Sequence, residues 1–290
     1  MTKKFFQYWK PLLAVVFWGA SFIATKIALK ELSPLMIIFC RLILGIILLT
    51  VFAVITKREF SLNLKNHGLI LILALVASFH LWIQVTGLQY TTASNTGWII
   101  GVTPVFMVLL GLIFFKEKLL PLQLTGIIIS FAGLLLLISR GKIGNIGLLS
   151  HKGDFMVLAS AFTWSVYSMV NKKITINYSP VMTILFLFLM MIIIISPFTL
   201  TAENIHAAFN LSAKGWAAVL FLGIFCSGVA YVLWAQSLKT MNASSVGAFL
   251  YLEPFVTVFV AWLLLSEIIT ALMILSGLII MLGVVLVNRK

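Results

Sequence analysis

The segment WGASFIATK at 18–26 has a counterpart 146 residues later, WSVYSMVNK at 164–172. The same offset carries Ser33-Pro34 onto Ser179-Pro180. Later in the chain the offset becomes 150, and the pairs that it relates are Ala93-Ser94 with Ala243-Ser244, Gly97 with Gly247, Pro104 with Pro254, Glu117 with Glu267 and Gly133 with Gly283. Matches that keep their order indicate a duplication with a four-residue loop insertion, rather than chance similarity between apolar segments. We therefore predict two units, at 1–140 and 141–290.

The composition places most of the chain in lipid. Of its residues 62% are hydrophobic and 9% are charged, whereas soluble domains are about 45–50% apolar and about 25% charged. The apolar runs are continuous rather than alternating, which favours helices over a β-barrel. We predict an all-α integral membrane fold.

Ten stretches approach the roughly 20 apolar residues that a bilayer-spanning helix needs. They lie near 12–30, 34–56, 68–88, 92–115, 121–139, 154–172, 180–201, 215–238, 243–265 and 269–287. Each unit would therefore hold five spans, and an odd number of spans inverts the second unit in the membrane. Inverted repeats are typical of secondary transporters, whose substrates bind near the midplane.

The net charge of +13 reflects basic residues in short connecting segments, a pattern that signals topology rather than a nucleic-acid partner. With the N-terminus inside, 13 basic residues lie on the cytoplasmic side, and the five on the outer side are Lys30, Arg140, Lys142, Lys152 and Lys214. This bias predicts that both termini are cytoplasmic, in the cell membrane. The segment 140–152 runs against the bias. Lys26 and Arg41 fall within spans.

Several stretches resemble the EamA type of the drug/metabolite transporter superfamily. They include FWGASFIATKIAL at 17–29, Arg41-Leu42, GLQYTTASNTGWIIGVTPVF at 87–106 and FKEKLLPLQLTGIIISFAG at 115–133. The second half is similar at GDFMVLASAFTWSVYSMV and from Leu238 onward. The resemblance implies ten helices around a central cavity, lined mainly by helices 1, 3, 4, 6, 8 and 9. It also implies an exporter of amino acids, other metabolites or drugs.

We predict a secondary transporter or facilitator that exports small neutral, zwitterionic or aromatic metabolites by alternating access. A multidrug exporter is the alternative within transport, because a weakly polar aromatic cavity suits both. An integral membrane enzyme and a membrane sensor are alternatives of other classes. An enzyme would need a catalytic cluster, and the sequence displays neither such a cluster nor a phosphate-binding glycine loop. No cofactor or metal is predicted.

Polar and aromatic residues within spans are the candidates for substrate contact. They are spaced to share helix faces, and they are His80, Gln84, Asn95, Trp98, Trp164, Tyr167, Asn171, Tyr231 and Trp234. The alternative for the tryptophans is interfacial anchoring. Among these residues we predict that His80 recognises the substrate.

Three further charged residues are candidates for gating or coupling. Lys26 and Lys172 hold equivalent repeat positions, where they either snorkel to the interface or close a gate. Glu253 precedes Pro254, which breaks the helical hydrogen-bond ladder. This carboxyl either couples transport to protons or caps the broken backbone. Arg41 is interpreted as structural.

Small residues on the fifth and tenth spans allow close helix packing. They are Gly126, Ser130 and Gly133 on the fifth span and Ser276 and Gly283 on the tenth. Internal packing is one interpretation, which leaves a monomer, and a homodimer through these two helices is the other. The predicted partners are the small-molecule substrate and membrane lipid.

Overall fold

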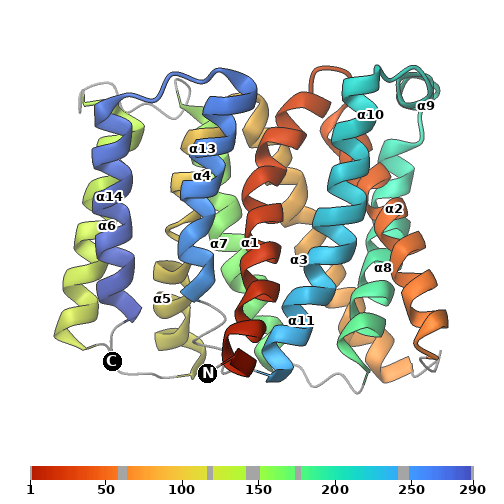
Figure 1. Cartoon of the computed structure of the whole chain (residues 1–290), viewed down its shortest axis with the longest axis horizontal. Helices are drawn as coiled ribbons and strands as arrows, with labels where there is room; N and C mark the ends of the chain where they lie inside the picture. The colour runs from red at the N-terminus through yellow and green to blue at the C-terminus, as the bar shows by residue number, and fades with distance from the viewer. Residues whose placement is uncertain are drawn as a thin grey trace. The chain divides into compact units, whose positions relative to one another are not determined.

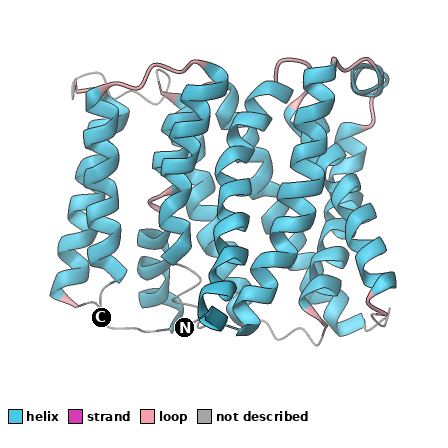
Figure 2. Cartoon of the chain, in the orientation of Figure 1, coloured by secondary structure: helices cyan, strands magenta, loops and turns pink. Residues whose placement is uncertain are grey.

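The computed structural model describes residues 2–57, 64–115, 120–141, 151–173, 178–240 and 248–288. Throughout these residues the chain is helical and contains no strand (Figure 2). In the described part of the chain, seven helices are long and apolar enough to cross a membrane by length and composition, and Phe249–Leu265 and Ala271–Val287 are shorter apolar helices. The predicted all-α integral membrane class is therefore confirmed at this level.

The chain divides into two compact units, and each takes segments from both halves of the sequence. Unit 1 comprises Met1–Trp82 and Ile174–Glu253, and unit 2 comprises Ile83–Lys173 and Pro254–Lys290. Unit 1 holds α1 (Thr2–Ala28), α2 (Pro34–Ile55), α8 (Pro180–Thr199), α9 (Ala202–Phe209), α10 (Ala213–Leu220), η2 (Phe221–Val229), α11 (Ala230–Thr240) and η3 (Ala248–Leu252). Unit 2 holds α4 (Ala93–Ile100), α5 (Thr103–Phe115), α6 (Pro121–Ser139), α7 (Lys152–Lys173) and α14 (Ala271–Asn288). The helices α3 (Leu64–Gln89) and α13 (Glu253–Leu265) each have residues in both units, and Glu253 is the one residue of α13 in unit 1.

The helices α2 and α8 begin in the same way. Ser33 and Ser179 are their N-caps, and each hydroxyl accepts a hydrogen bond of 3.4 Å from the backbone N–H three residues ahead. A proline occupies the first helical turn in both, where its missing N–H costs nothing. The two helices also pack against each other within unit 1. The repeated Ser-Pro pair thus sets both helix starts.

In unit 2, α6 and α14 run side by side (Figure 1). Small residues allow this approach: a Cβ on Gly126 would lie 2.6 Å from the Gly283 carbonyl oxygen, and one on Gly133 would lie 2.8 Å from the Ile280 nitrogen. The Ser130 hydroxyl also donates to the Ile280 carbonyl at 3.3 Å. The predicted small-residue stripe therefore packs within the chain, and a dimer through these helices would need their other faces.

Several predicted spans differ from the structure, and in 243–265 the described part begins with the 3-10 helix η3 before α13. The first helix begins at Thr2 rather than near residue 12. The span 92–115 is interrupted at Gly101 and Val102, between α4 and α5. The span 215–238 contains the nine-residue π-helix η2 between α10 and α11. Pro104, which lacks an N–H, lies at the start of α5 and favours the first of these breaks.

Candidate functional site

The π-helix η2 packs closely on one face of α2 in unit 1. Arg41, Leu44, Gly45 and Leu48 share that face by helical spacing. A Cβ on Gly223 would lie 2.4 Å from the Leu44 Cβ, and a Cβ on Gly228 would lie 2.3 Å from the Leu48 Cδ2. Two glycines of η2 therefore leave the space that two leucine side chains of α2 occupy.

Arg41 lies at this contact. Its side chain is 8% exposed, and its Nε donates to the Ser227 hydroxyl at 3.0 Å. The approach depends on Gly45, one turn further along α2, because a Cβ there would lie 3.0 Å from the Ser227 Cβ and 3.2 Å from the Phe188 ring. The structure thus places a guanidinium group inside a span, against η2.

An aromatic cluster extends from the same part of η2 to α1. The Trp18 ring lies 5.6 Å from Tyr231 and 5.1 Å from Trp234 between centroids, and Phe188 lies 5.4 Å from Tyr231. The Trp18 indole N–H donates to the Cys226 carbonyl at 3.1 Å, and the Cys226 thiol donates to the Phe17 carbonyl. These two bonds attach η2 to α1. The predicted residues Tyr231 and Trp234 are therefore neighbours, with Trp18 as a member that the sequence did not single out.

In unit 2, the predicted residues Trp164 and Tyr167 stack on each other, with centroids 5.1 Å apart and planes at 23°. They lie on α7, which the buried Ser165 ties to α5 through a bond to the Thr103 carbonyl at 3.2 Å. Asn171, two turns from Trp164 on the same helix, is exposed.

Trp98 is buried rather than exposed. It is 2% exposed, lies 5.2 Å from the Phe255 ring, and covers Gly277, where an added Cβ would lie 2.4 Å from the indole. Its indole N–H has no hydrogen-bond partner among the described residues. Its predicted contact with substrate stays a prediction.

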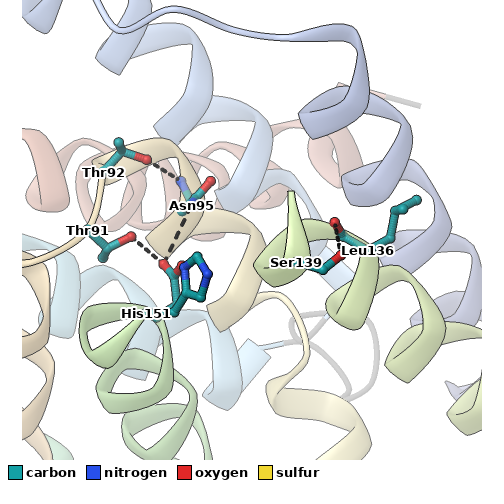
Figure 3. A network of polar contacts seen from close by, with 7 residues as sticks. Thr91, Thr92, Asn95, Leu136, Ser139 and His151 are labelled. Atoms are coloured by element: carbon teal, nitrogen blue, oxygen red, sulfur yellow. Dashed lines mark hydrogen bonds and ion pairs between the residues drawn. The ribbon is translucent and has the colours of Figure 1, made fainter. Parts of the chain in front are cut away.

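The corner between α3 and α4 carries a polar cluster, of which the sequence indicated Asn95 alone (Figure 3). Asp154, 2% exposed at the start of α7, accepts from the Thr91 hydroxyl and, at 3.4 Å, from the Asn95 side-chain amide. The His151 Nδ1 lies 4.0 Å from the same carboxylate. The predicted residue Asn95 thus has a partner within the protein. Asp154 was missed because it borders a polar connection and looks like a loop residue.

The N-terminus of α4 is capped twice. Thr92 accepts from the Asn95 N–H at 3.0 Å, and the Glu267 carboxylate accepts from the N–H groups of Ala93 and Ser94 at 2.8 and 3.0 Å. A carboxylate at this end of a helix accepts from N–H groups that have no partner within the helix. Its negative charge also interacts favourably with the positive end of the helix dipole. Glu267 is therefore a capping residue.

The remaining candidates lie on α1, α3, α7 and α13. His80 and Gln84 are one turn apart on α3; His80 is 4% exposed and Gln84 is half-buried. Lys26 is half-buried near the end of α1, and Glu253 is the first residue of α13. Lys172 lies on α7, with its side chain outside the described residues. Their predicted roles stay predictions.

Long apolar helices in two compact units define a multi-pass membrane protein. The profile of the EamA-like transporter family matches the chain twice, at residues 8–139 and 151–289. The chain belongs to the EamA-like transporter family, within the drug/metabolite transporter superfamily predicted from the sequence.

Relatives and a solved structure agree with this membership. An uncharacterized transporter of Archaeoglobus fulgidus is 32% identical over 280 residues, which cover 96% of each chain. A probable amino-acid metabolite efflux pump of Escherichia coli K12 is 29% identical, over 94% of this chain and 91% of its own. A crystal structure matches 97% of both chains with a TM-score of 0.66 at 16% identity, a likeness of fold alone.

Proposed function

We propose that this protein is a secondary transporter or facilitator that exports small organic metabolites, with amino acids and similar zwitterionic or aromatic compounds as the substrate class. The observation that carries the proposal is the family profile, which matches both halves of the chain. The substrate class is supported by the relative named as a probable amino-acid metabolite efflux pump. The proposal places the chain in the cell membrane, with both termini cytoplasmic.

The proposal includes ten spans in two inverted repeats, at 1–140 and 141–290, around a central cavity. Two pairs of repeat-equivalent helices support it, because α2 packs on α8 and α6 packs on α14. Elements related by a two-fold axis contact each other where the axis passes between them. The equivalent caps Ser33 and Ser179 support the same symmetry.

Multidrug export is the second candidate function. The observation that favours it is the cluster of Trp18, Tyr231 and Trp234, which offers broad aromatic faces and few hydrogen-bonding groups. Export of several unrelated apolar cations, with no amino acid moved, would select this function. We propose transport rather than enzyme activity because the family is one of transporters.

The experiment is counterflow in proteoliposomes with a panel of amino acids. A facilitator exchanges labelled substrate without a pH gradient, and an imposed gradient produces no accumulation. His80→Ala should weaken exchange, since His80 is proposed to recognise the substrate.

Uphill accumulation driven by the pH gradient would contradict the facilitator. If Glu253→Gln abolished this accumulation and His80→Ala did not, Glu253 would be the coupling residue. Flux of no organic solute at all, with a normally inserted protein, would reject transport itself and favour a sensor or an enzyme.

A further inference from the structure

Arg41 is a positive charge inside a membrane span, and the described residues offer little to neutralise it. It lies on α2, roughly 10 Å along the helix axis from Pro34, and is 8% exposed. Ionisable residues at such depth are costly and normally pair with an opposite charge or serve a functional site. The neighbours of Arg41 therefore decide between these two roles.

Those neighbours leave the guanidinium group largely unsatisfied. The bond from Nε to the Ser227 hydroxyl is the one hydrogen bond that Arg41 makes to the described residues, and no described carboxylate forms an ion pair with it. A neutral hydroxyl does not compensate a buried charge. The two terminal amino groups keep their donors, in the planar fork that binds a carboxylate with two parallel hydrogen bonds.

The surroundings of Arg41 suit an amphipathic ligand. Tyr231 follows Ser227, the hydrogen-bond partner of Arg41, by four residues along the helical stretch of η2 and α11, and its hydroxyl makes no hydrogen bond to a described residue. The same tyrosine contacts the rings of Trp18 and Phe188, and Trp18 contacts Trp234. Tyr231 therefore connects the side of η2 that contacts Arg41 with the aromatic cluster.

Arg41 has no charged counterpart at the equivalent position of the second repeat. The offset of 146 relates Arg41 to Leu187 on α8, which is 3% exposed. A structural requirement shared by the two repeats would give both positions similar side chains. The positive charge of Arg41 occurs in one repeat alone, as expected for a residue that binds one end of an asymmetric ligand.

From this geometry we propose that Arg41 and Tyr231 bind the carboxylate of the transported molecule, whose apolar part contacts Trp18 and Trp234. The ligand class is a monocarboxylate with an apolar body, such as an apolar amino acid. This inference rests on the proposed function and deepens it, because it names the group on the substrate that the protein recognises.

The test compares an amino acid with its amide, which keeps the side chain and loses the negative charge. Counterflow is measured for leucine, phenylalanine and their amides, in the wild type and in Arg41→Gln, Arg41→Lys and Lys214→Gln. The last variant removes an exposed positive charge from the same unit and is the matched control.

The wild type and Lys214→Gln should prefer the acid over the amide by about 10- to 100-fold, the discrimination of a charged hydrogen bond. In Arg41→Gln the preference should fall to about one while the amide still moves, and Arg41→Lys should keep part of it. A lost preference with unchanged amide flux separates recognition from a folding defect.

Equal handling of acid and amide by the wild type would overturn the inference while the proposed function stands. An Arg41→Gln variant that keeps the wild-type preference would overturn it as well. If Arg41→Gln does not insert into the membrane, the acid-to-amide flux ratios of the wild type and of Arg41→Lys decide the question in the same way. Flux of neither compound in the wild type, with no other organic solute moved, would reject both the inference and the proposed function.

Discussion

Single carboxylates accept hydrogen bonds at the N-termini of two helices, Glu31 at α10 and Glu267 at α4. Glu31, in the turn after α1, accepts from the Ser212 N–H at 2.7 Å and from the Ser212 hydroxyl at 2.6 Å, where Ser212 caps α10. These two bonds lower the pKa of Glu31 below its ordinary value, the side-chain bond most strongly. The carboxylate is therefore bound more favourably in the folded state than in the unfolded one.

The pH dependence of stability follows from that sign. Because the pKa of Glu31 is lower when folded, its stabilisation is complete above the ordinary pKa of the group and is lost as pH falls through the lowered value. We expect Glu31→Gln to lower the Tm in detergent at pH 7 and to match the wild type in strong acid. Glu203→Gln, at an exposed carboxyl on α9, is the control. A Tm difference that persists at low pH would contradict this account.

Trp164 tests the predicted substrate contacts in unit 2. It is half-buried and stacked on Tyr167 at 5.1 Å, so its removal takes away one face of the pair. We expect Trp164→Ala to cut amino-acid counterflow at least several-fold while insertion into the membrane stays normal. Trp262→Ala, which removes a 55% exposed ring from α13, should keep the wild-type rate. Normal flux in Trp164→Ala would remove this residue from the site.

Between elements, the tightest packing joins η2 to α2. The Leu44 Cβ cannot move away from a new methyl group on Gly223, since it is attached directly to the backbone. We expect Gly223→Ala to lower the free energy of unfolding by about 1–3 kcal/mol, the usual effect of overpacking. The readout is thermal unfolding in detergent.

Gly68 provides the comparison, because nothing lies within 4 Å of a Cβ built there. Gly68→Ala should be neutral or stabilising by up to about 1 kcal/mol, from helix propensity alone. Gly228→Ala should be intermediate, since the nearest atom is the far end of the Leu48 side chain. Equal stability of all three variants would show that the glycines do not set the contact.

At the level of elements, the all-helical class and several helix boundaries were predictable from the sequence. Pro34 and Pro180 mark starts that the structure reproduces, and the span 121–139 agrees at both ends with α6. The π-helix was not predictable, because hydropathy averaged over a span ignores which carbonyl each N–H meets. The break after Ile100 had a signal in Pro104, which a hydropathy average also ignores. The short helix α9 was missed because its eight residues are too few to cross a membrane.

Part of the arrangement of the candidate residues was predictable, whereas their contact with substrate stays a prediction. Helical spacing placed Tyr231 with Trp234 and Trp164 with Tyr167. Trp18 contacts both rings of the first pair, and the rings of the second pair stack on each other. Trp18 could have been found, since it is the repeat counterpart of Trp164. The setting of Arg41 could not, because its contact with Ser227 joins positions 186 residues apart.

At the scale of the whole molecule, the charge bias predicts that both termini lie in the cytoplasm. In a background with Cys40 and Cys226 replaced by serine, a cysteine at Asn288 should react with an impermeant maleimide after the membrane is opened and not before. A cysteine at Phe209, which is 81% exposed on α9, should react from outside in intact cells. Labelling of the Asn288 position in intact cells would invert the topology.

The π-helix has a consequence for how the gene can change. Its hydrogen bonds reach five residues back and accommodate one residue more than α-helical winding would. Deletion of one residue between 221 and 229 would therefore let the segment rewind as an α-helix, while Tyr231 and Trp234 keep their direction toward Trp18. Insertion of a further residue has no such outlet, and it would turn every residue beyond by about 100° around the axis. We expect this stretch to tolerate the loss of one codon in frame and not the gain of one.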